Sequence, residues 1–209
     1  MKRQWLFYGL IVILVFLNLY AFICSDYYQG NEGLFTLIAI SITAIVAILT
    51  LNHSVSESNR RYEKEINEAT LKHCRYYLEE LQKDLIGLKN TGILDGPVIF
   101  RDLKTANRAS LQASYPGMFE KYNSSSKDVL DATIQLLNKY NAFAASFLVG
   151  RLDRKLGSDQ IGYLFCVHVD WLTGLIAFWT PDNDSERLFK MILELRKVWG
   201  FKPRKFEHE

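Results

Sequence analysis

Two long uncharged runs open the chain: WLFYGLIVILVFLNLYAFIC from Trp5 to Cys24, and GLFTLIAISITAIVAILTL from Gly33 to Leu51. An α-helix rises about 1.5 Å per residue, so a run of about twenty residues can cross a hydrocarbon core of about 30 Å. The segment 25–33 between the runs is too short to form a domain. We therefore predict an antiparallel transmembrane hairpin with spans over about 5–24 and 33–51.

Charged residues near the ends of the runs predict the orientation of this hairpin. Basic residues flank it and acidic residues lie in its loop: Lys2, Arg3, Arg60, Arg61 and Lys64 against Asp26 and Glu32. Basic residues near span ends stay in the cytoplasm. Both termini are therefore expected inside. A cleaved signal peptide or a lipoprotein is disfavoured, because the first run is long and bulky residues precede Cys24.

The second run carries a face of small residues, which we call the small-residue seam. It comprises Thr36, Ala39, Thr43, Ala47 and Thr50. Small residues let helix backbones approach closely in lipid. We favour packing of this seam on the first span of the same chain. The alternative is self-association, around a water-filled path.

Composition limits the class of protein. The chain has 209 residues and a net charge of +2, which is not the strongly basic balance of a dedicated nucleic-acid binder. The region 53–209 is long enough for one soluble domain beyond the hairpin of residues 1–52. The three cysteines, Cys24, Cys74 and Cys166, suggest no disulfide framework, since the latter two are expected in the reducing cytoplasm.

The domain 53–209 is predicted to be cytoplasmic and α-helical, which makes the whole chain mainly α. Capping residues, glycines and apolar periodicity predict helices over about 54–89, 126–149, 159–179 and 184–199, with a helical piece between about 100 and 114. The expected N-caps are Ser125, Ser158 and Asn183, and Gly200 is expected to end the last helix.

Two of these helices have informative apolar faces. The segment 159–179 is apolar nearly all round, as in a core helix; a third span is disfavoured because His168 and Asp170 would be costly in lipid. The segment 54–89 carries a heptad-like seam that is expected to pack on its own domain, with a dimeric stalk as the alternative. That seam comprises Leu71, Cys74, Leu78, Leu81, Leu85 and Leu88.

Motifs of catalysis or metal binding are missing from the sequence. It has no phosphate-binding glycine loop, HExxH, nucleophile elbow or Cys-x-x-Cys. Cys166 and His168 diverge on a helix and cannot share a metal, while Asp153 and its neighbours are expected in a solvated turn with an ion pair. We expect no cofactor, no metal and no enzymatic activity. A membrane-bound hydrolase or nuclease built on Asp153, His168 and Asp170 is the alternative.

Basic residues gather at the C-terminal end. They are Arg196, Lys197, Lys202, Arg204 and Lys205. A solvated helix end is favoured by the helix dipole and is the simpler interpretation. Contact with anionic lipid or with nucleic-acid phosphate is the functional alternative.

The stretch LNKYNAFAA from Leu137 to Ala145, followed by Gly150-Arg151-Leu152-Asp153, resembles a helical domain of unassigned function in small bacterial membrane-anchored proteins. The resemblance covers roughly Val129 to Trp199. The layout of two spans and a cytosolic helical domain is also similar to membrane effectors of anti-phage systems, including retron effectors.

This resemblance implies a toxin-like effector of abortive infection in the bacterial inner membrane, with both termini cytoplasmic. Its implied partners are the lipid bilayer, further copies of the chain, and a reverse transcriptase with its nucleic acid that restrains the effector. It implies no small-molecule substrate and supplies no catalytic residue. The alternative function is a membrane anchor or scaffold for a cytosolic complex.

Overall fold

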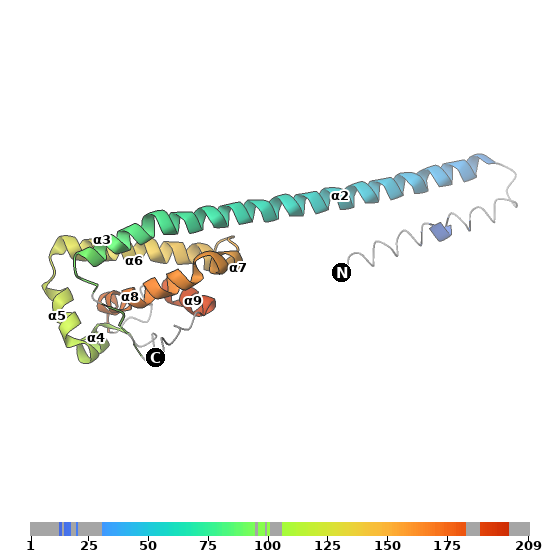
Figure 1. Cartoon of the computed structure of the whole chain (residues 1–209). Coiled ribbons are helices and arrows are strands. Elements are labelled where there is room, and N and C mark those ends of the chain that lie inside the picture. Colours follow the sequence, from blue (N-terminus) through green and yellow to red (C-terminus); the bar gives the residue numbers. More distant parts are fainter. Residues whose placement is uncertain are drawn as a thin grey trace, which may run out of the picture. The chain divides into compact units, whose positions relative to one another are not determined.

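The computed structural model describes residues 13, 15–17, 20, 31–94, 96–98, 100, 106–182 and 189–200, with the side chains of 31–37 left undescribed. The chain consists of two compact units, Met1–Glu63 and Lys64–Glu209. The described residues are mainly helical and contain no strand, which confirms the predicted class (Figure 1). Of the first expected span, the described residues are Ile13, Val15–Leu17 and Tyr20, all helical. The hairpin therefore stays a prediction.

Helix α2 runs without interruption from Asn31 to Tyr76. A π-helical turn, η2 (Tyr77–Leu81), and α3 (Gln82–Asn90) continue it. No break separates the apolar run 33–51 from the segment 54–89, because no proline or glycine lies between Gly33 and Gly87 to interrupt the hydrogen-bonded ladder. The expected end near Asn90 is confirmed, and Gly92 follows it with a φ of 78°.

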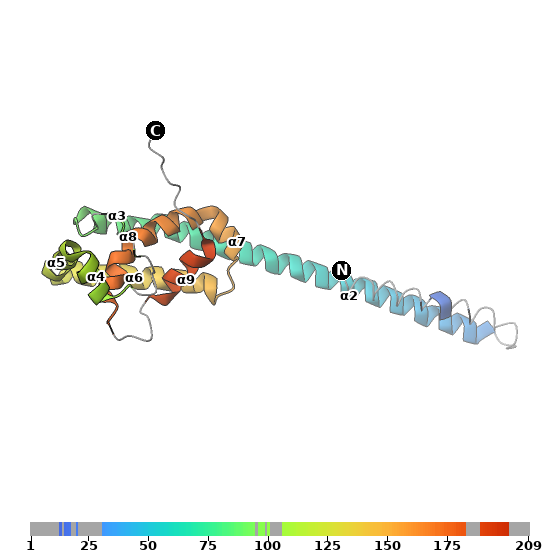
Figure 2. The same ribbon diagram turned by 90° about the horizontal axis from the view of Figure 1, so that it is seen from below.

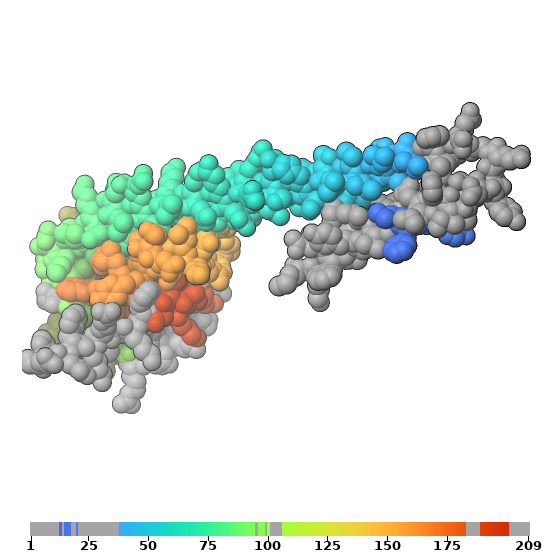
Figure 3. All heavy atoms as spheres, turned by 45° about the vertical axis from the view of Figure 1, so that its right-hand side comes forward, coloured from blue at the N-terminus to red at the C-terminus, as the bar shows by residue number. Residues whose placement is uncertain are grey.

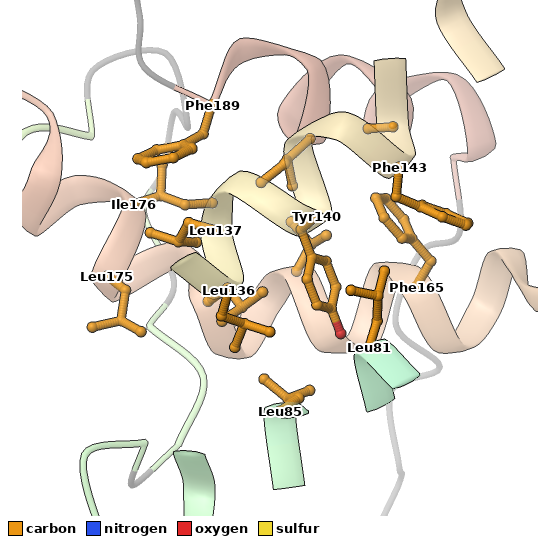
Figure 4. Packing of buried hydrophobic residues seen from close by; sticks show 14 of the residues in the cluster. Leu81, Leu85, Leu136, Leu137, Tyr140, Phe143, Phe165, Leu175, Ile176 and Phe189 are labelled. Carbon is orange, nitrogen blue, oxygen red and sulfur yellow. The ribbon is translucent and has the colours of Figure 1, made fainter. Parts of the chain in front are cut away.

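The second unit is built around α6 (Lys127–Leu148) and α8 (Tyr163–Trp179). Helix α9 (Lys190–Trp199) lies against both (Figures 1 and 2). In Figure 4, Phe143 of α6 lies beside Phe165 of α8, and their ring centroids are 5.8 Å apart. Leu172 and Leu175 of α8 are fully buried. The expectation that 159–179 forms the core helix is therefore confirmed.

The shorter helices differ from the sequence-based expectation. Helix α4 (Arg108–Ser114) is capped by Asn107, and α5 (Pro116–Ser124), which was not predicted, starts at a proline. Proline is well tolerated at the first helical position, because its missing N–H would have no partner there anyway. A single residue, Tyr115, thus joins two helices.

Two predicted caps are displaced. Helix α6 is capped by Ser126, whose Oγ accepts from the Val129 amide, and Ser125 instead donates to the carbonyl of Lys121. The core helix begins earlier than expected, through α7 (Arg154–Gly157) and the π-helical turn η4 (Ser158–Gly162). The expected cap Asn183 lies outside the described residues.

The last helix ends as expected at Gly200, whose φ is 61°. Its first described turn follows Phe189, a buried residue with a φ of 64°. A bulky residue adopts this left-handed conformation only at a cost, which the packing of its ring in the core offsets.

Two helical stretches are long and apolar enough to cross a membrane, judged by length and composition alone: Ile38–Asn90 and Arg154–Trp179. The apolar window of the second is 67% buried inside its own unit, whereas that of the first is 6% buried. A core helix and a membrane span pass the same compositional test. Burial therefore assigns the second stretch to the protein core and leaves the first as the candidate span.

Candidate functional site

The small-residue seam lies on the exposed part of α2. Ala39, Thr43, Ala47 and Thr50 are all exposed, and Thr36 falls among the residues whose side chains are not described. Thr43 donates its hydroxyl hydrogen to the Ala39 carbonyl at 2.8 Å. Thr50 donates in the same way to Val46 at 2.8 Å. Because these bonds stay within the helix, the seam can present methyl groups to an apolar neighbour.

The buried face of the same stretch of α2 is a different one. Ser41 is 6% exposed, and Ile38, Ile45 and Ile48 are partly buried. At about 100° per residue, these positions lie on the side of the helix opposite Ala39, Thr43 and Ala47. The favoured interpretation, in which the seam packs on the first span, stays a prediction, because only residues 13, 15–17 and 20 of that span are described.

An open hollow lies beside the seam. Its volume is about 450 Å³, and it is lined by Ala39, Ile40, Thr43, Ala44 and Ala47. The hollow arises because alanine and threonine leave space between bulkier neighbours such as Ile40. Its apolar lining suits a hydrocarbon chain or a packed helix.

The basic residues at the C-terminal end are not all available for an anion. Arg196 is bound to Asp170 of α8, with Nη2 at 2.6 Å and Nε at 2.7 Å from the same carboxylate oxygen. Lys197 is exposed on α9. Lys202, Arg204 and Lys205 lie outside the described residues. Arg196 therefore serves to hold α9 against α8, since its charge is already paired.

A polar cluster inside the second unit was not anticipated. The Tyr77 hydroxyl lies 2.7 Å from Nδ1 of His168, and the Tyr140 hydroxyl lies 3.1 Å from the same nitrogen. An unprotonated Nδ1 has one lone pair and can accept from one of these hydroxyls at a time. Burial lowers the pKa of His168 to about 4 and raises the pKa of Tyr77. The cluster keeps His168 neutral at physiological pH and ties α8 to α6 and η2.

Two positions of the predicted seam of 54–89 are one residue out, which is why the sequence missed Tyr77. Leu71 and Leu78 are 45% and 46% exposed, whereas Thr70 and Tyr77 are fully buried. The second of these positions lies at the π-helical turn that begins at Tyr77, which heptad spacing does not predict. The seam does pack on its own domain, as favoured, through Cys74, Leu81, Leu85 and Leu88.

The three residues of the hydrolase alternative have separate partners. Asp153 caps α7 by accepting from the amides of Lys155 and Leu156, so it is not in the ion-paired turn that was expected. Its neighbour Arg154 donates to the Phe147 and Leu148 carbonyls at the end of α6. Asp170 binds Arg196, and His168 binds the two tyrosines. The structure thus gives these residues no shared site, and in its described part no group of His, Cys, Asp and Glu could hold a metal.

Comparison with known proteins gives no relative for this chain: no family model, no curated protein and no solved structure matches it.

Proposed function

We propose that this protein is a bacterial inner-membrane effector of anti-phage defence, which acts by damaging the membrane when infection releases it. The observation that most directly supports this proposal is the exposed small-residue seam, which lies on a helix apolar enough to span a bilayer. Close helix approach through small residues is the main route to helix association in lipid. The seam lies opposite the face of α2 that is buried within the chain, so a second copy could occupy it.

The second unit serves in this proposal as the part that binds the restraining partner. Asp153, Asp170 and His168 are engaged in capping, ion pairing and a core hydrogen bond, respectively, rather than in a shared catalytic site. A reverse transcriptase carrying its nucleic acid is the partner that the resemblance implies. Restraint and release require two states, a closed form and an assembled membrane form, whose balance the partner shifts.

The test is to express the full chain alone in bacteria and to follow membrane potential with a voltage-sensitive dye. Ala39, Thr43 and Ala47 are each changed to Leu, which keeps the helix hydrophobic but blocks close approach. The matched control is Ile42→Phe, which adds bulk on an exposed face of α2 outside the seam. We expect depolarisation with the native chain and the control, and its loss in the seam variants.

Other outcomes point away from the proposal. Depolarisation that survives all three leucine substitutions would remove the seam from the mechanism. If the chain never depolarises the membrane, even during infection with its genomic neighbours present, the scaffold function is favoured instead.

A further inference from the structure

The segment of α2 between the candidate span and the second unit has an unusual environment. Every residue from Leu51 to Glu65 is exposed, although the helix continues unbroken through it. Figure 3 shows the side chains on one face of this stretch. Isolated helices of about 12–15 residues are marginal in water, because forming the first turn is unfavourable and each further residue adds only a little stability. A contact that lies along this stretch would stabilise it.

One stripe along the segment repeats with heptad spacing. Asn52, Val55, Asn59, Tyr62 and Ile66 follow one another at intervals of three, four, three and four residues, and we call them the stalk stripe. Val55 and Tyr62 are 47% and 51% exposed. In heptad terms, Val55 and Tyr62 occupy d positions, while both asparagines occupy a positions.

The charged residues avoid this stripe. Two ion pairs run along the helix, Glu57 with Arg61 at 3.8 Å and Lys64 with Glu68 at 3.7 Å, and the His53 ring lies 3.5 Å from the Glu57 carboxylate. Every member of these pairs falls at a b, c or f position of the same heptad, which is the outer face of a coiled coil. The outer face is therefore charged and internally paired, and the stripe is uncharged.

The asparagines identify the occupant of the stripe. Asparagine at an a position is a poor residue for an apolar partner surface, but in a parallel pair of identical helices it meets its own copy and can donate and accept at once. Because the two asparagines are seven residues apart, both meet an asparagine of the second copy only when the two helices are in register. In that register Ser58, at g, lies next to Glu63 of the second copy, at e, so no like charges oppose each other. The stripe is self-complementary.

We propose that α2 pairs through the stalk stripe with α2 of a second copy, as a short parallel two-stranded coiled coil. The proposal does not rest on membrane damage, because it concerns a surface outside the apolar run. The stripe and the small-residue seam lie on opposite sides of α2, and the stripe continues the side on which Ser41, Ile45 and Ile48 are at least partly buried within the chain. The paired helices must therefore separate before Ile48, and stalk dimers can assemble further through the seam.

Disulfide cross-linking of the full chain in bacterial membranes tests the pairing. The background is Cys24→Ser, since Cys74 and Cys166 are buried at 4% and 3% exposure. Val55→Cys and Tyr62→Cys place a thiol at d positions, and Glu57→Cys is the matched control at an outer f position two residues from Val55. After mild oxidation we expect a dimer band for the d positions that exceeds the control by about tenfold or more.

A second pair of variants tests the asparagine. Asn59→Lys puts like charges opposite each other in the pair, whereas Asn67→Lys makes the same change at an outer b position. We expect Asn59→Lys to lower cross-linking of Val55→Cys by about tenfold and Asn67→Lys to leave it unchanged. All these sites are exposed, so the second unit should stay folded, which tryptophan fluorescence verifies.

Several results would overturn the inference. Equal cross-linking at Val55→Cys and Glu57→Cys would indicate random collision, and absence of the dimer band at both d positions would show that the stripes do not meet. Cross-linking of Val55→Cys that is unchanged by Asn59→Lys would also show that the stripes do not meet. Failure of the proposed function is separate: Ala39→Leu should abolish depolarisation yet leave the cross-link at Val55→Cys intact, because the seam faces away from the stripe.

Discussion

Helix α8 and the apolar part of α2 have similar compositions and opposite surroundings. The stretch Arg154–Trp179, which ends with α8, and the stretch Ile38–Asn90, which begins in α2, each contain a window hydrophobic enough to cross a bilayer. The window of the first stretch is 67% buried, and that of the second is 6% buried. The difference teaches that hydrophobic length alone does not identify a span. What separates the two helices is the set of partners available to their polar and bulky side chains.

The polar residues of the two helices make this distinction concrete. In α8, Asp170 pairs with Arg196 and His168 bonds to Tyr77, so both of these ionisable side chains have a partner on another helix. In α2, the hydroxyls of Thr43 and Thr50 bond to their own helix. A helix that satisfies its polar groups internally can face lipid, whereas α8 requires its neighbours.

The largest expected contrast comes from one substitution made in both helices. Leu175→Ala in α8 removes a fully buried side chain, so we expect it to lower the free energy of unfolding by about 2–5 kcal/mol. Leu49→Ala in α2 removes a side chain that is 50% exposed and should change it by less than about 0.5 kcal/mol. Urea unfolding of the full chain in detergent, followed by tryptophan fluorescence, measures both. Equal losses would contradict the assignment of α8 to the core.

Acidification is expected to weaken the second unit through His168. Its folded pKa of about 4 lies below the ordinary value of 6.5, so the unfolded chain binds the extra proton between these pH values. Stability is complete above about pH 6.5 and falls as the pH drops toward 4. After allowance for partial exposure, the loss is about 2 kcal/mol.

His168→Asn keeps an acceptor near the Nδ1 position and should flatten this pH dependence. His53→Asn is its control, because His53 lies on the exposed part of α2. Unfolding measurements from pH 7.5 to 4.5 compare the three proteins. A native slope that persists in His168→Asn would assign the dependence to another group.

The ion pair between α8 and α9 gives a smaller effect. Asp170 and Arg196 are 27% and 23% exposed at their side chains, so solvent screens their attraction in part. Asp170→Asn keeps the size but removes the charge, and we expect a loss of about 1–2 kcal/mol. The control is Glu194→Gln, whose partner Lys190 lies on the same exposed helix face and is 63% exposed. Its change should be within about 0.5 kcal/mol. Similar losses in both would contradict a fastening role for Arg196.

The sequence predicted the helical class and the core helix because both follow from local pattern. The apolar character of α8 and the glycine after Trp199 are visible without any tertiary contact. Tyr77 was missed because it begins a π-helical turn, which periodicity does not encode. The cap at Asp153 is local, and it was missed because the helix was expected to begin only at Ser158. The small-residue seam was found from spacing, but its exposure depends on which face of α2 the chain itself buries.

The smallest expected effects come from removing one hydroxyl in each helix. Thr173→Val in α8 deletes a buried hydroxyl that donates to the Val169 carbonyl at 2.9 Å, and its cost should be about 1 kcal/mol. Thr43→Val deletes an exposed hydroxyl with the same kind of bond to Ala39, and stability should stay within about 0.5 kcal/mol.

Valine has nearly the shape of threonine, so Thr43→Val also separates shape from polarity at the seam. If the seam works by close packing of helices, Thr43→Val depolarises membranes as the native chain does, while Thr43→Leu does not. Loss of depolarisation in Thr43→Val would mean instead that the hydroxyl itself is needed, as it would be beside a water-filled path.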